Sequence, residues 1–123
     1  MKIEVSTGEI VDKLTILEIK EEKCYDESKL LNIKQELEYL RNIVSSLNVP
    51  IELINSLREI NNKLWNIEDD IRICEKNFIF DDEFISLARL VYHTNDERFK
   101  LKSQISQVTN SNFKEEKIHP SYE

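Results

Sequence analysis

The chain has 123 residues, a formal net charge of −7 and 33% charged residues, but only one glycine and two prolines. This length suits a single domain, and the scarcity of turn residues favours long helices over strands joined by tight turns. The acidic balance argues against a nucleic-acid partner, and without a long apolar run or a secretory signal the chain is expected to be cytoplasmic and not inserted in a membrane.

The first predicted helix follows Ser6 and ends near Cys24. Before it, residues 2–5 alternate polar and apolar side chains, a pattern typical of a short edge strand or of an extended segment that leads into the helix. Ser6 and Glu9 have the spacing of a capping box, in which the serine binds a backbone N–H and the glutamate reaches back. The helix itself is apolar nearly all round, so we expect neighbouring helices to enclose it.

Two further helices carry unbroken apolar seams, in which residues recur at alternating spacings of three and four. The first should be capped by Asp26 and end near Asn48, and the second should have Pro50 in its first turn and reach about Lys76. The seam residues are Leu30, Ile33, Leu37, Leu40, Val44 and Leu47 in one helix, and Leu53, Leu57, Ile60, Leu64, Ile67, Ile71 and Cys74 in the other.

The fourth predicted helix follows Asp81, ends around Thr109 and has a polar interruption in its apolar stripe. The stripe runs through Phe84, Leu87, Ala88, Val91, Asn95, Arg98, Lys102 and Ile105. Polar residues at such positions predict a polar layer inside a helical bundle. Residues 110–123 are predicted to form a loop-like tail.

Together these elements predict an all-α fold, an antiparallel up-down-up-down four-helix bundle that forms one domain over residues 1–123. At about 1.5 Å per residue, the third and fourth helices would each be about 40 Å long and the first about 27 Å. The longer pair should therefore overhang the shorter pair. Overhanging apolar seam residues favour a homodimer.

The polar layer has a predicted composition. Levels estimated along the helices place Glu18, Asn61, Asn95 and Arg98 together. An unpaired guanidinium in the seam would be costly, so Arg98 should bind a carboxylate of the first helix, Glu18 first and Glu21 second, with Asn61 or Asn95 completing the layer. Two interpretations stay open: the layer fixes helix register or dimer pairing, or it is a polar pocket for an anionic ligand.

The candidate ligand-binding residues lie on the first, third and fourth helices. They are Asp12, Lys13, Glu18, Asn61, Trp65, Glu68, Arg72, Tyr92, Asn95, Asp96 and Arg98. Glu68 and Arg72 also have the i,i+4 spacing of an ion pair. If a cofactor is needed it would be Mg²⁺ on Glu68 and Asp69, since Mg²⁺ takes oxygen ligands, although consecutive carboxylates point to different sides of a helix.

Three stretches, STGEIVDKLTILEIK (6–20), LWNIEDDIR (64–72) and YHTNDER (92–98), resemble a family of small uncharacterised bacterial proteins. The resemblance covers nearly the whole chain and includes most of the candidate residues. It implies no activity. Similar segments accompany glycosyltransferases and cell-surface glycan genes, so the resemblance implies a connection with surface-glycan assembly.

Two functional hypotheses from different classes follow. The first is a non-enzymatic, homodimeric helical bundle without a cofactor, which serves as an accessory or interaction protein in cell-surface glycan assembly and binds a protein partner. The second is a Mg²⁺-dependent all-α enzyme that acts on a nucleotide or another phosphorylated metabolite. It would use Asp12, Glu18, Glu68 and Asp69, with Arg98 as an anion clamp.

Overall fold

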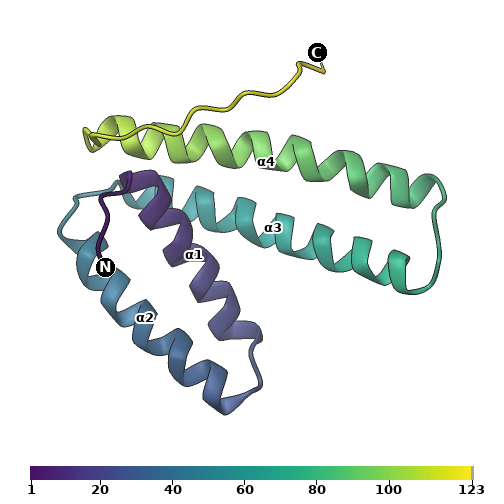
Figure 1. The fold of residues 1–123 in the computed structure, drawn as a ribbon, viewed down its shortest axis with the longest axis horizontal. Coiled ribbons are helices and arrows are strands. Elements are labelled where there is room, and N and C mark those ends of the chain that lie inside the picture. Colours follow the sequence, from purple (N-terminus) through teal and green to yellow (C-terminus); the bar gives the residue numbers. More distant parts are fainter. Residues whose placement is uncertain (123) are drawn as a thin grey trace.

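The computed structural model describes residues 1–122 and is helical throughout its regular structure (Figure 1). The helices are α1 (Thr7–Lys23), α2 (Glu27–Ser45), α3 (Ile51–Lys76) and α4 (Asp82–Val108). Residues 2–5 have no regular secondary structure, so of the two alternatives the N-terminal strand is wrong. A strand needs a neighbour with which to exchange backbone hydrogen bonds, and no described segment forms a ladder with these residues.

Side chains at the expected positions begin three of the helices. The Ser6 hydroxyl accepts from the Glu9 N–H at 3.2 Å, Asp26 accepts from the first-turn N–H groups of α2, and Asp81 accepts from the Phe84 N–H at 3.2 Å. The second half of the predicted capping box is wrong, because the Glu9 carboxylate forms an ion pair with Lys102. These caps satisfy backbone donors that the first helical turn leaves free.

The four helices form the predicted all-α bundle, arranged as two hairpins that cross at an angle (Figure 1). The backbone of α1 approaches α2, α3 and α4 within 8 Å, whereas α2 approaches only α1. As predicted, α3 and α4 are the longest helices. None of the helices described in residues 1–122 has the length and apolarity needed to span a bilayer.

The main hydrophobic core lies where α1 joins the two hairpins. Its buried members are Val11, Leu14, Leu17, Leu37, Leu40, Val44, Ile54, Leu57 and Ile105. At Gly8 the start of α1 touches α4, since a Cβ atom built there would lie 2.2 Å from the Lys102 carbonyl oxygen. At the same contact, the Gly8 N–H donates a hydrogen bond to the Ser106 hydroxyl of α4 at 2.9 Å. A residue without a side chain therefore permits the close crossing of α1 and α4.

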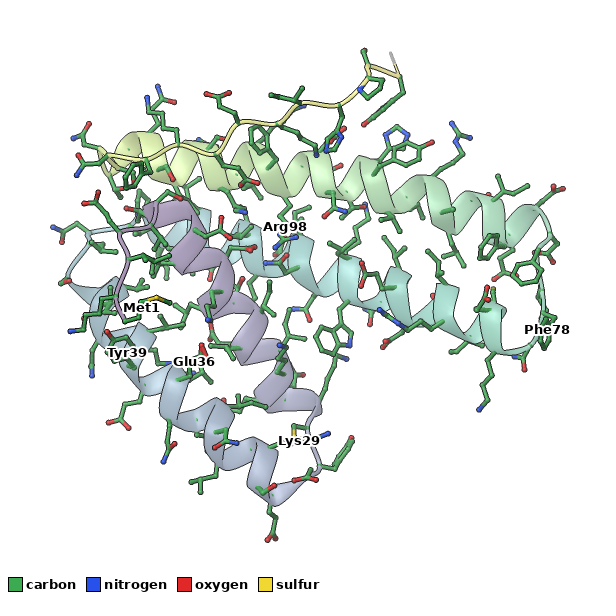
Figure 2. All side chains as sticks on the ribbon, in the orientation of Figure 1. Met1, Lys29, Glu36, Tyr39, Phe78 and Arg98 are labelled. Atoms are coloured by element: carbon green, nitrogen blue, oxygen red, sulfur yellow. The ribbon has the colours of Figure 1, made fainter. Side chains whose placement is uncertain are left out.

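Beyond that crossing, the α3–α4 hairpin continues as two helices without a third (Figure 1). Its end carries exposed apolar side chains, which we call the hairpin tip. The tip residues, with their exposed fractions, are Ile73 (56%), Phe78 (82%), Ile79 (42%), Phe80 (53%) and Ile85 (54%). Phe78 lies at the turn, at the far end of the molecule from α2 (Figure 2).

The predicted tail is irregular, as expected, but it lies against the bundle. After α4 ends, the chain turns back and residues 111–122 run along α4 in the opposite direction (Figure 1). At the start of this segment, the Ser111 hydroxyl accepts from the Thr7 N–H at 2.7 Å and donates to the Thr7 hydroxyl at 2.8 Å. We call residues 111–122 the tail segment.

Candidate functional site

A buried polar layer connects α1, α3 and α4, with Asp12 at its centre. Arg98 donates from Nε and Nη2 to the two Asp12 carboxylate oxygens, at 2.9 and 2.5 Å. Asn61 donates from Nδ2 to Asp12 Oδ1 at 2.9 Å. The Asp12 residue is only 2% exposed, so these donors replace water around its carboxylate. Arg98 enters the layer from α4 (Figure 2).

Thr15 completes this layer, which we call the Asp12 layer: Asp12, Thr15, Asn61 and Arg98. Asn61 Nδ2 lies 2.8 Å from the Thr15 hydroxyl oxygen, and that hydroxyl donates to the Asp12 carbonyl at 2.8 Å. The hydrogen bonds to Asp12 raise the pKa of Arg98 above its ordinary value, although burial opposes this. Arg98 therefore stays protonated in the layer despite its partial burial.

The predicted partner of Arg98 was wrong, although its class was right. Arg98 binds a carboxylate of the first helix, as expected, but that carboxylate is Asp12 and neither Glu18 nor Glu21. Glu18 instead pairs with Arg58 Nη2 at 3.0 Å, and Glu21 lies 3.9 Å from Arg41. Because α1 crosses the α3–α4 hairpin at an angle, its first half contacts α4 while its second half turns away (Figure 1).

A second buried cation lies one turn along α4 from Arg98. Lys102 is 7% exposed, and its Nζ binds Glu9 Oε2 at 3.0 Å and Glu115 Oε2 at 2.8 Å. Burial lowers the pKa of Lys102, but the bonds to Glu115 and Glu9 outweigh it, so the pKa lies above the ordinary value. Lys102 therefore joins α1, α4 and the tail segment.

The tail segment and the face of α4 that it covers border a cleft. Asp96 accepts hydrogen bonds from Lys117 and Tyr122, which hold the pKa of its carboxyl below the ordinary value. The Tyr122 ring lies 5.0 Å from that of Tyr92 and 4.7 Å from that of His93, measured between centroids. Two cavities, of about 470 and 880 Å³, remain between α4 and the tail segment.

The candidate residues separate into groups. Asp12, Asn61 and Arg98 meet in the Asp12 layer. Tyr92, Asn95 and Asp96 line the cleft under the tail segment, where the Asn95 amide oxygen also lies 3.5 Å from Arg98 Nη1. The others, Lys13, Glu18, Trp65, Glu68 and Arg72, lie outside both places.

The candidates outside the layer have their own contacts. Lys13 pairs with Glu36 at 2.7 Å, and Glu68 pairs with Arg72 at 3.5 Å, as their spacing predicted. Trp65 is half-buried on α3. Within residues 1–122 no three His, Cys, Asp or Glu side chains gather as a metal site would require.

Several site residues were missed by sequence reasoning. Thr15 lies one turn after Asp12 on a helix that is apolar nearly all round. A polar residue at this position could therefore have indicated a buried polar contact beside Asp12. Glu115, Lys117 and Tyr122 belong to an irregular segment, and no periodicity there indicates which side chains face α4.

Fold and site together define a class: an all-α protein of two crossed hairpins, joined by a buried charged layer and covered on one side by its own C-terminal segment. The chain belongs to a family described as a family of unknown function (DUF6165), whose sequence profile matches residues 1–121. No curated protein matches the chain, and no solved structure does so either.

Proposed function

We propose that this protein is a non-enzymatic, homodimeric interaction protein, in which the hairpin tip pairs with a second copy. The observation that carries this proposal is the exposed apolar end of the α3–α4 hairpin. Phe78 is 82% exposed, and Phe80 and Ile85 are each more than half exposed. Contiguous exposed apolar side chains of this kind mark association surfaces.

The geometry favours a second copy as the occupant. Past the crossing with α1, α3 and α4 pack only against each other, so one side of their seam stays open. Its residues Phe84, Leu87, Ala88 and Val91 are only partly buried. Two such hairpins related by a twofold axis would close this seam into a four-helix arrangement, with the same residues on both sides of the interface.

The Asp12 layer supports a structural role better than a catalytic one. Asp12 already accepts two hydrogen bonds from Arg98 and one from Asn61. A substrate that took Arg98 would leave the Asp12 carboxylate buried without its countercharge, which is strongly unfavourable. A layer so connected fixes the register of α1 against α3 and α4.

The contacts of the other carboxylates do not favour the Mg²⁺-dependent enzyme as a second function. Glu18 pairs with Arg58, and Glu68 pairs with Arg72. These carboxylates engage different partners in different parts of the bundle. Neither the family description nor the fold supports the expected connection with surface-glycan assembly. The expected cytoplasmic location rests on the sequence alone.

Sedimentation equilibrium at micromolar concentration tests the dimer. We expect a species of twice the 14.6 kDa chain mass. The double variant Phe78→Ser/Phe80→Ser should be a monomer with unchanged helix content. A matched control is Phe113→Ser, which removes a side chain that is 54% exposed on the tail segment and should leave the dimer intact. A wild-type protein that stays at 14.6 kDa over the whole range would rule the dimer out.

A further inference from the structure

The tail segment contacts α4 through two ion pairs of opposite polarity. Glu115 binds Lys102 at 2.8 Å, and Lys117 binds Asp96. Since the tail segment runs antiparallel to α4, an acidic and then a basic residue meet a basic and then an acidic residue. A tail shifted along α4 would bring like charges together. The charge order therefore selects one register.

The tail segment does not fill the surface that it covers. Phe113 is 54% exposed and Ile118 90% exposed, so neither of these large apolar side chains is buried against α4. A cavity of about 470 Å³ lies between the tail segment and α4, lined by Asn95, Arg98, Phe99 and Lys102 on one side and by residues 115–119 on the other. At the Lys117–Asp96 pair, both side chains keep between a quarter and a third of their surface exposed. Partly exposed ion pairs of this kind hold a segment weakly.

We propose that this surface of α4, between Tyr92 and Lys102, is a recognition site for an extended peptide of a partner protein, and that the tail segment occupies it as a built-in competitor. The ligand is a segment with a carboxylate side chain, a lysine or arginine two residues later, and an apolar side chain that fills the cavity beside Phe99. The site lies away from the hairpin tip, so it stands or falls independently of the dimer.

The charges favour a peptide over a small anion. Asp96 and Lys102 are six positions apart, about 9 Å along α4. One small anion would bind Lys102 and leave Asp96 without its cation. Two residues of extended chain cover about 6.6 Å, and flexible lysine and glutamate side chains bridge the difference. A peptide therefore presents both charges at once, as the tail segment does.

The test uses the full chain with its tail released. In the double variant Glu115→Lys/Lys117→Glu, like charges face each other at both pairs, so the tail segment should leave α4. The probe is a fluorescein-labelled synthetic peptide of residues 111–122. We expect this peptide to bind the variant, and to bind the wild-type chain about tenfold more weakly or worse, because a tethered competitor acts at an effective concentration in the millimolar range.

Charge-swapped partners provide the matched controls. The peptide with the same two substitutions should not bind the variant. A second released chain, Asp96→Lys/Glu115→Lys with Lys117 retained, also has like charges at both pairs. It should bind the wild-type peptide weakly and bind a peptide that carries only Lys117→Glu more strongly. Equal binding of the wild-type and charge-swapped peptides would overturn the proposal, as would no binding to a variant whose circular dichroism matches the wild type.

A second measurement needs no variant, so it holds even if the released chain is unstable. Excess unlabelled peptide added to the ¹⁵N-labelled wild-type chain should move the amide signals of residues 113–121 to disordered positions. Unmoved signals at saturating peptide would overturn the proposal. Equal displacement by millimolar inorganic phosphate would assign the surface to a small anion. If the wild-type chain were a dimer and the released variant a monomer, the surface would be assigned to the tail of a second copy.

Discussion

α4 contributes one residue to each of two aspartate–cation pairs, and these pairs differ in burial. The difference in burial decides whether a pair can exchange its partner. Arg98 reaches inward to Asp12, whose side chain is 3% exposed, whereas Asp96 faces outward to Lys117, and both of those side chains are more than a quarter exposed. Residues 96 and 98 are two positions apart, so their side chains point about 200° apart around the helix. One helix thus carries an inner and an outer pair.

In the inner pair, no second cation among residues 1–122 forms a hydrogen bond to Asp12 that could replace Arg98. Without Arg98 the Asp12 carboxylate, whose side chain is 3% exposed, would keep only the Asn61 amide as a hydrogen-bond donor. In the outer pair, water can hydrate Asp96 when Lys117 leaves, because the Asp96 side chain is 30% exposed. The inner pair is therefore suited to fix the helices, and the outer pair is suited to exchange partners.

The largest predicted effect is the loss of the inner pair. Arg98→Met leaves the Asp12 carboxylate buried without its countercharge, and we expect the free energy of unfolding to fall by about 3–5 kcal/mol. Urea denaturation followed by circular dichroism measures this. The double variant Asp12→Leu/Arg98→Met should recover much of the loss, since it removes both charges.

Arg58→Met is the matched control, because it removes the partner of another carboxylate on α1. Glu18 keeps 24% of its side chain exposed, so water can replace Arg58 and the loss should stay below about 1 kcal/mol. Equal losses in Arg98→Met and Arg58→Met would contradict the distinction between buried and exposed pairs.

A smaller effect is predicted at the contact that allows the inner pair to form. The Cβ atom of Gly8→Ala would overlap the Lys102 backbone, which cannot rotate away as a side chain can. We expect a loss of about 1–3 kcal/mol, as for other overpacked contacts. An exposed control on the same helix, Lys20→Ala, should change stability by less than about 0.5 kcal/mol. A more stable Gly8→Ala would mean that α1 can move away from α4.

Much of the fold, but little of the outer site, was predictable from the sequence. Apolar periodicity located all four helices to within about three residues, and the break in the stripe at Asn95 and Arg98 indicated a polar layer. The sequence indicated Glu18 as the partner of Arg98 where the structure has Asp12. Apolar periodicity indicates which face of a helix is buried, but it does not indicate the angle at which two hairpins cross. The contacts of Glu115 and Lys117 depend on the path of an irregular segment, which has no sequence period.

The smallest effect on global stability, and the most local, is predicted at the outer pair. Lys117 and Tyr122 lower the pKa of Asp96 below its ordinary value of 3.8. Its contribution to docking of the tail segment is therefore fully present above pH 3.8 and is lost as the pH falls through the lowered value. Glu115, which faces Lys102 and Glu9, still anchors the start of the segment.

Asp96→Asn separates this contribution from other acid effects, because it removes the charge at neutral pH. We expect ¹⁵N relaxation to show residues 117–121 becoming mobile in the variant, while the urea midpoint stays unchanged. In the wild type the same residues should become mobile in acid before the helical signal is lost. If the tail segment were released only together with global unfolding, the outer pair would belong to the same cooperative unit as the inner pair. A partner peptide could then not displace the tail segment without unfolding the bundle.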